Sequence, residues 1–157
     1  MLGFCVILVQ PLLAAGRLPG LGARAGRRVH RWTGAALALL VLAHVAGLWI
    51  TSPPDVIDAL TFASPTPFAA WGVAAMWAVL GSAALALARR RIRPAAWRAL
   101  HTGLALVVVI GTVVHAALIE GTMGTASKAL LCALALGASA WAVLGLRAWA
   151  PLLRARG

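Results

Sequence analysis

The chain holds four histidines, and their spacing makes them the first candidates for chemistry. His30 and His44 are fourteen residues apart in one apolar run, and His101 and His115 repeat that spacing in another. Fourteen residues make almost four turns of an α-helix with a drift of roughly 40°. Both imidazoles of a pair therefore share one helix face, about 21 Å apart along the axis. Because imidazole is a good ligand for transition metals, each run offers two metal-ligating groups at two levels.

The elements that carry these pairs are predicted to be membrane-spanning helices. Of the 157 residues, 62% are hydrophobic and 11% are charged, whereas a soluble domain carries about 25% charged residues. Lipid cannot satisfy exposed backbone groups, which favours helices, and about 20 apolar residues cross a bilayer. We predict an all-α integral membrane protein with one domain over residues 1–157. It is a five-helix transmembrane bundle with helices near 1–16, 29–51, 68–90, 98–120 and 126–148.

The first apolar run is the shortest and contains Gln10 and Pro11. A secretory signal peptide is the alternative, but the positively charged segment that precedes its apolar region is missing. Positive charge instead follows the run, beginning at Arg17. We expect a spanning helix with its N-terminus outside, or a helix whose true beginning lies upstream.

The net charge of +11 is distributed as expected for a membrane protein. Of thirteen arginines, five lie within residues 17–31, five within 89–98 and three within 147–156. In a five-helix serpentine these segments share one side, and the other side carries the remaining charges, Asp55, Asp58, Glu120 and Lys128. The positive-inside rule then predicts a multi-pass protein of the inner (plasma) membrane, with N-terminus outside and C-terminus cytoplasmic. Topology and anionic-lipid contact explain the charge better than nucleic acid, which we do not expect as a partner.

The second and fourth predicted helices run parallel, because one spanning helix separates them. His30 is then level with His101 near the cytoplasmic side, and His44 with His115 in the outer half. Two levels of facing imidazoles suit two stacked haems, each iron taking one axial nitrogen from each helix. We therefore predict bis-histidine haem sites between helices 2 and 4, with two b-type haems (heme b) as the main expectation and one as the lesser outcome.

Small and basic residues near the two levels would accommodate a porphyrin and its propionates. The residues that would leave room for the ring are Gly34 and Ala105 near the inner level, and Gly47 and Gly111 near the outer level. Arginine pairs well with carboxylates, so the predicted propionate partners are Arg28, Arg31 and Arg98.

Other kinds of site fit the histidines less well. A lone intramembrane histidine usually forms a hydrogen bond between helices. That role does not explain why four histidines form two pairs with the same spacing. Opposing pairs about 21 Å apart cannot converge on one tetrahedral zinc ion. A proton relay remains open, although no Asp or Glu lies within the apolar runs. The segment GLGARAG, residues 20–26, lacks the strand–turn–helix context of a nucleotide loop, so we expect no flavin or NAD(P) site in this chain.

Two stretches resemble the ferric reductase-like transmembrane domain, namely VHRWTGAALALLVLAH (29–44) and WRALHTGLALVVVIGTVVHAALIEGTMG (97–124). That family includes ferric reductases, the membrane core of NADPH oxidases and the haem subunit of a periplasmic methionine sulfoxide reductase system. The resemblance extends from about residue 3 to residue 149, and its most specific parts are H-R-W-T-G and the two histidine pairs. It implies that His30, His44, His101 and His115 hold two b-type haems that carry electrons across the bilayer.

The expected function is therefore that of a transmembrane b-type cytochrome that carries electrons from the cytoplasmic side to an unknown acceptor on the outer side. Many family members continue into FAD- and NAD(P)H-binding domains, which this sequence does not contain. We expect the donor to be a separate cytoplasmic flavoprotein reductase, a quinol or a domain beyond this sequence. Two alternatives stay open: a self-sufficient ferric or oxygen reductase of the outer face, and a haem-free membrane scaffold or transporter.

Overall fold

The computed structural model describes residues 2–120 and 124–146 of the chain, and every regular element in these ranges is helical. The elements are α1 (Leu2–Ala15), α2 (Ala23–Thr51), α3 (Pro53–Leu60), α4 (Pro67–Leu87), the 3-10 helix η1 (Ala88–Arg91), α5 (Pro94–Leu118) and α6 (Thr125–Leu146). The described part of the chain is all-α, as predicted. The arginines within 147–156, which were expected at the cytoplasmic end, lie outside the described residues.

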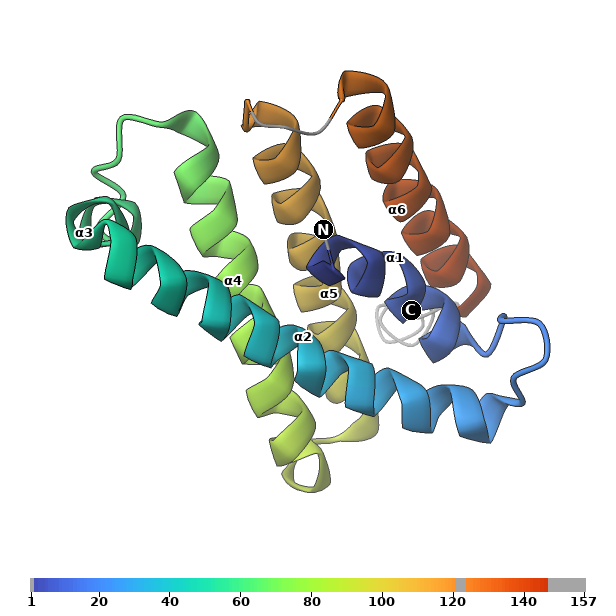
Figure 1. Ribbon diagram of the computed structural model, residues 1–157. Coiled ribbons are helices and arrows are strands. Elements are labelled where there is room, and N and C mark those ends of the chain that lie inside the picture. Colours follow the sequence, from blue (N-terminus) through green and yellow to red (C-terminus); the bar gives the residue numbers. More distant parts are fainter. Residues whose placement is uncertain (1, 121–123, 147–157) are drawn as a thin grey trace, which may run out of the picture.

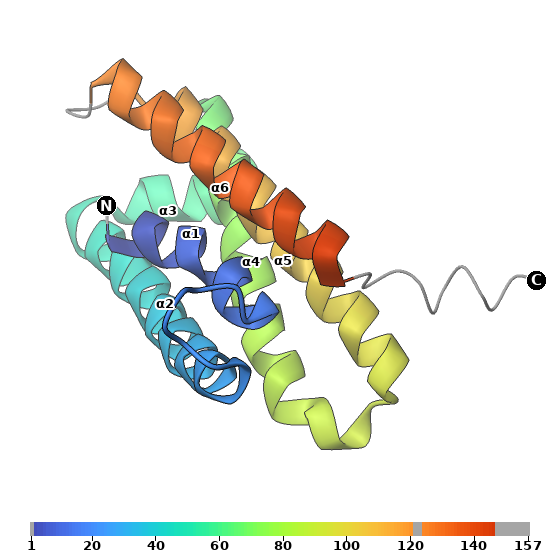
Figure 2. The same ribbon diagram turned by 90° about the vertical axis from the view of Figure 1, so that its right-hand side faces the viewer.

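Within the described ranges, four helices are long and apolar enough to cross a membrane: Ala23–Thr51, Pro67–Arg91, Pro94–Leu118 and Thr125–Gly145. The first helix, α1, has only 14 residues. At 1.5 Å per residue it is about 21 Å long, less than the roughly 30 Å hydrocarbon core. In both views α1 begins about halfway along the bundle (Figures 1 and 2). Four of the five predicted spans thus correspond to helices that are long enough to cross a membrane. The first predicted span is instead a shorter helix, α1, packed within the bundle.

The neighbouring helices α4 and α5 form the closest packed pair of the bundle. Their close approach is helped by Gly111 of α5, where an added Cβ would lie 3.0 Å from the carbonyl oxygen of Trp71. The last helix, α6, packs against α5, and α1 packs against both α6 and α2. Figure 1 shows α2 crossing in front of α4 and α5 at an angle. The helices that carry the histidine pairs, α2 and α5, run in the same sense as predicted, but they cross instead of lying alongside each other.

One hydrophobic cluster ties four of these helices together. Its buried members are Ile7, Leu37, Ala78, Val79, Val108 and Val109. Many other large apolar side chains point outward, for example Ile50, which is 81% exposed, and Leu87, which is 89% exposed. A folded chain in water would leave few such side chains uncovered, whereas a bilayer covers them with lipid.

The connection between α2 and α4 contains a helix that the sequence analysis did not predict. Pro53 and Pro54, which lie between two of the predicted spans, open α3. Proline is favourable at the first helical positions, because its missing N–H would have no partner there. The Ser52 hydroxyl donates to Asp55 Oδ2 at 2.6 Å, and Val56 anchors the helix by being buried.

The two ends of the bundle are held by different basic residues. At one end, the Arg17 guanidinium carbon lies 4.6 Å from the ring centre of Trp141, which fixes the α1–α2 connection to α6. At the other end, Lys128 Nζ donates to the carbonyl oxygen of Ile119 at 2.5 Å, which links the start of α6 to the end of α5.

Candidate functional site

Two of the four histidines meet inside the bundle. The ring centres of His30 on α2 and His101 on α5 are 6.1 Å apart, with an angle of 82° between the ring planes. Both side chains are half-buried. Among the described residues, α2 packs mainly against α1, α3 and α4. The His30 and His101 rings are thus a contact between α2 and α5 outside the main helix–helix interfaces.

The ring of His30 is held by the first helix. Its Nδ1 lies 3.2 Å from the main-chain carbonyl oxygen of Gln10. A carbonyl oxygen can only accept a hydrogen bond, so Nδ1 carries the hydrogen and Nε2 keeps its lone pair. Metal-ligating histidines commonly use this arrangement, in which the second ring nitrogen donates to a carbonyl and fixes the tautomer. This hydrogen bond thus leaves the Nε2 lone pair of His30 free for another partner.

The ring of His101 is held by stacking. Trp97, one turn earlier on α5, lies with its ring centre 4.9 Å from that of His101 and with the planes 12° apart. The Trp97 indole N–H donates to the carbonyl oxygen of Leu85 at 3.2 Å. Nδ1 of His101 is buried and has no hydrogen-bond partner among the described residues. A buried polar atom without a partner is uncommon and calls for a functional or structural explanation.

The His30–His101 pair fits the axial ligands of a haem iron. Two metal–nitrogen bonds of about 2 Å, with each ring centre about 1 Å behind its nitrogen, would put the ring centres roughly 6 Å apart. Within the described residues, no group of three or more His, Cys, Asp or Glu side chains is placed to hold a metal ion. Two protein ligands without a third suit a metal whose remaining positions are filled by its own macrocycle, as in haem.

Leu37 of α2 and Val108 of α5 lie halfway between the two histidine levels along their own helices. Leu37 is seven residues from both His30 and His44, and Val108 is seven residues from both His101 and His115. Both belong to one buried cluster that also contains residues of α1 and α4. At the midpoint, α2 and α5 are therefore parts of the same apolar core.

The outer pair is arranged differently. His44 is exposed on α2, whereas His115 turns toward α4, where its Nδ1 lies 2.8 Å from the carbonyl oxygen of Phe68. The Phe68 ring packs against His115 edge-on, with centres 5.7 Å apart. Among the described residues, the ring contact found for the inner pair has no counterpart between His44 and His115. As in His30, the hydrogen bond at Nδ1 leaves Nε2 of His115 available.

The predicted propionate partners lie at the basic end of the bundle. Arg28 and Arg31 are exposed on α2 on either side of His30 in the sequence, and Arg98 is exposed near the start of α5. Their pairing with propionates stays a prediction.

Two of the small residues expected to make room for a porphyrin have other neighbours. An added Cβ at Gly34 would lie 3.3 Å from Gln10 Nε2, so this glycine accommodates the side chain of α1. Gly111 packs against α4, where an added Cβ would lie 3.1 Å from Ala75 Cβ. The expectation for Gly111 was wrong, because it faces the neighbouring helix in the chain and not α2.

Three residues of the site were missed. Gln10 supplies the carbonyl that holds His30, and its only sequence signal was a polar side chain in an apolar run. Trp97 precedes His101 by four residues, a spacing that places both on one helix face. Gly72 makes room for His115, since a Cβ there would lie 2.7 Å from two atoms of the imidazole ring. The role of Gly72 depends on how α4 and α5 pack, and no feature of the sequence around it indicates that role.

The fold and the site define a multi-span, all-helical membrane protein with facing imidazoles inside the bundle. Residues 1–112 match the family model described as the ferric reductase like transmembrane component. Because the match covers well over half of the chain, the protein belongs to this family. The matched segment includes His30, His44 and His101 and ends shortly before His115. No curated protein and no solved structure matches the chain.

Proposed function

We propose that the protein is a transmembrane b-type cytochrome that carries electrons from the cytoplasmic side to an acceptor on the outer side. The observation that carries the proposal is the meeting of His30 and His101, from two different spanning helices, with ring centres 6.1 Å apart. Membership of the ferric reductase-like family supports a transmembrane electron-transfer component.

In this proposal the chain supplies ligands, orientation and a dry setting. When bound, a haem would supply reversible one-electron chemistry at its iron. His30 and His101 would hold the inner haem, with Gln10 and Trp97 fixing their rings. His44 and His115 would be the outer ligands, which requires the two side chains to turn toward each other.

The direction of electron flow rests on the arginines. The α1–α2 connection and the turn between α4 and α5 lie toward the same end of the bundle (Figure 1), and each contains several arginines. The positive-inside rule assigns this end to the cytoplasm. In this assignment α1 is the first helix of a five-helix bundle. It begins in the outer half of the membrane, and its C-terminal end reaches the level of His30 and His101. The proposed donor is a separate flavoprotein reductase or a quinol at the cytoplasmic side.

Haem content and the spectra of single variants test this proposal. The purified protein should contain two low-spin haems per chain by pyridine haemochrome, or one if the outer level does not assemble. His30→Ala and His101→Ala should remove the same low-spin signal. Thr33→Val is a matched control, because the Thr33 hydroxyl donates only to carbonyls of its own helix, at 2.9 and 3.3 Å.

Two results would contradict the proposal. A folded protein without haem, even after reconstitution, would favour a scaffold or transporter. Loss of different signals in His30→Ala and His101→Ala would disprove their sharing of one iron.

A further inference from the structure

The ring of His101 differs from those of His30 and His115 at one atom. Nδ1 of His30 and Nδ1 of His115 each lie close to a main-chain carbonyl oxygen, at 3.2 and 2.8 Å. Nδ1 of His101 is buried and forms no hydrogen bond among the described residues. A metal-ligating histidine almost always donates a hydrogen bond from its second ring nitrogen. If His101 holds a haem iron as proposed, its Nδ1 requires an acceptor.

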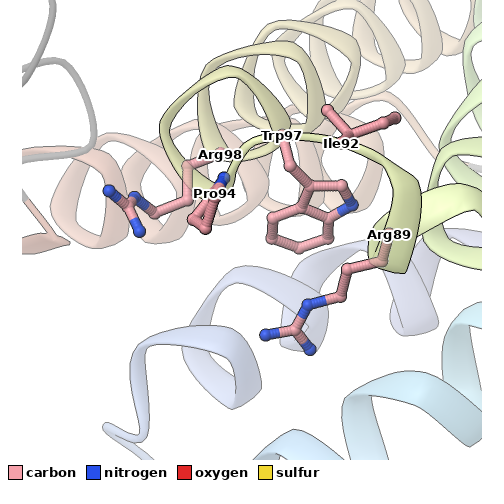
Figure 3. A pocket seen from close by; sticks show the side chains of 5 residues that line it. All are labelled: Arg89, Ile92, Pro94, Trp97 and Arg98. Carbon is pink, nitrogen blue, oxygen red and sulfur yellow. The ribbon is translucent and has the colours of Figure 1, made fainter.

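Trp97 is not this acceptor. Its ring lies nearly parallel to the imidazole of His101, with the two planes 12° apart, so it covers the face of that ring. An indole nitrogen can only donate, and that of Trp97 already donates to the carbonyl oxygen of Leu85. Arg89 packs against Trp97 in turn, with its guanidinium carbon 5.0 Å from the ring centre (Figure 3). The acceptor for Nδ1 must therefore come from another residue.

The hydroxyl of Ser82 on α4 is also buried without a hydrogen-bond partner among the described residues. A helical serine or threonine commonly donates to the carbonyl oxygen four residues earlier. Ser139 does so to Ala135 at 2.7 Å, and Thr33 does so to Val29 at 2.9 Å. Ser82 forms no such bond, so its hydroxyl is available to a neighbouring helix.

Two contacts between α4 and α5 fix how these helices are aligned. In the first, a Cβ added at Gly81 would lie 3.6 Å from the side chain of Leu104. In the second, the indole nitrogen of Trp97 lies 3.2 Å from the carbonyl oxygen of Leu85. The two helices run in opposite directions and form the closest packed pair of the bundle. Residues between these two contacts therefore face each other across the interface.

Ser82 and His101 occupy matching positions between these contacts. Along α4, Ser82 lies one residue from the first contact and three from the second, and along α5, His101 lies three and four residues from them. Interpolation between the contacts puts the two residues at the same level to within about one residue, or roughly 1.5 Å. Residues three or four apart share a helix face, so both also lie on the faces that meet.

The side-chain oxygen of Gln10 is the rival acceptor, because it too is buried without a partner. Gln10 belongs to α1, which packs mainly against α2 and α6, whereas α5 packs mainly against α4 and α6. Its side-chain nitrogen lies toward α2, 3.3 Å from a Cβ added at Gly34. Ser82 is therefore the better placed of the two.

We propose that Ser82 is a positioning residue of the inner site, whose hydroxyl oxygen accepts a hydrogen bond from Nδ1 of His101 directly or through one bridging water. The inference rests on the proposed function. A serine hydroxyl has two acceptor lone pairs, and rotation about one side-chain bond redirects it. The hydrogen bond fixes the tautomer of His101 and makes its Nε2 a stronger ligand. In this way Ser82 adjusts the potential of the inner haem.

Nitrogen NMR of the haem-free protein, labelled with 15N-histidine, tests the hydrogen bond by itself. The signal of His101 is identified by its loss in His101→Ala. Ser82→Thr and Ser82→Val have nearly the same shape and differ in the hydroxyl, so a packing change affects both alike. We expect the Nδ1 signal of His101 to shift in Ser82→Val and to stay in place in Ser82→Thr. Ser139→Ala is the matched control, because it removes a buried hydroxyl that donates within α6.

The haem-loaded protein tests the consequence for the iron. Ser82→Val should weaken binding of the inner haem by about 10- to 100-fold and raise its midpoint potential, because a less basic imidazole stabilises ferric iron less. Each tenfold loss of ferric relative to ferrous binding corresponds to about 59 mV for one electron. Ser82→Thr should restore both values, and the outer haem should keep its potential in both variants.

The possible results separate hydrogen bonding from packing. Equal changes in Ser82→Thr and Ser82→Val would give Ser82 a packing role and overturn the proposal. An unchanged His101 signal in Ser82→Val, with a shift in Gln10→Leu, would make Gln10 the acceptor instead. An NMR shift without a change in the inner haem would refute the effect on potential. Absence of haem would refute the proposed function, whereas the haem-free NMR comparison would still decide the Ser82 hydrogen bond, so the two failures are distinguishable.

Discussion

Replacing Gly72 by alanine tests whether His115 has a fixed place between α4 and α5. A Cβ at residue 72 would lie 2.7 Å from both Cε1 and Nδ1 of His115, and ordinary van der Waals contact begins near 3.4 Å. The ring must therefore move by about 0.7 Å, or α4 must shift away from α5. Either movement strains the hydrogen bond between His115 Nδ1 and the carbonyl oxygen of Phe68, which is 2.8 Å long.

The size of the effect follows from these two contacts. Overpacking a buried position costs about 1–3 kcal/mol of unfolding free energy. Loss of a hydrogen bond that orients a ligating histidine lowers metal affinity by about 10- to 100-fold. If His115 is an outer haem ligand, Gly72→Ala should weaken the outer haem by that factor and leave the inner haem unchanged.

The assay is a haem titration of the protein in detergent, followed by low-spin resonance spectra. Gly72→Ala should weaken the signal that His115→Ala also removes and should keep the signal that His30→Ala removes. Gly103→Ala is the matched control, since no atom lies within 4 Å of a Cβ at that position of α5. Unchanged affinity at both levels in a folded Gly72→Ala protein would refute the role of His115. Loss of the inner signal would refute the assignment of the two levels.

Three other expectations concern packing and topology. Gly111→Ala should lower the unfolding free energy by about 1–3 kcal/mol in a denaturant titration, because the new Cβ would lie 3.0 Å from Trp71 O and 3.1 Å from Ala75 Cβ. Gly137→Ala is the control and should not lower it, because no atom lies within 4 Å of a Cβ at that position. Lys128→Met removes the hydrogen bond to Ile119 O. A charged hydrogen bond contributes about 1.5–3 kcal/mol, and each kcal/mol shifts the Tm by about 2–4 °C, so the Tm should fall by roughly 3–12 °C. An unchanged Tm would mean that this link does not stabilise the bundle. In a background without Cys5 and Cys132, an impermeant thiol reagent added to intact cells should label Ala63→Cys but not Gly22→Cys, and the reverse pattern would invert the proposed orientation.

Helix periodicity was sufficient to predict which residues share a face. The spacing of fourteen placed His30 level with His101, and those rings meet at 6.1 Å. The meeting of the inner pair could be anticipated because the direction of a side chain around a helix depends on its own helix alone.

The crossing of the helices could not be predicted in the same way. How closely α4 and α5 approach depends on Gly111 and Ala75 meeting across their interface, and nothing in either helix alone reveals that meeting. For the same reason the turn of His115 toward Phe68 and Gly72 was missed, as was the contact of Gln10 with His30. The helix α3 was missed because the sequence analysis considered only apolar runs long enough to span a membrane, whereas α3 has eight residues and begins with two prolines, which favour the first turn of a helix.

The apolar cluster between the two histidine levels has an electrical consequence. Ile7, Leu37, Ala78, Val79, Val108 and Val109 carry no side-chain group that accepts or passes a proton. An electron that crosses this cluster in the proposed direction is therefore not accompanied by a proton. Its transfer separates charge across the membrane. Each electron moved outward from a negative interior gains up to about 2.3 kcal/mol per 100 mV of membrane potential. The resting potential of the cell would then assist outward reduction, and a collapsed potential should slow it.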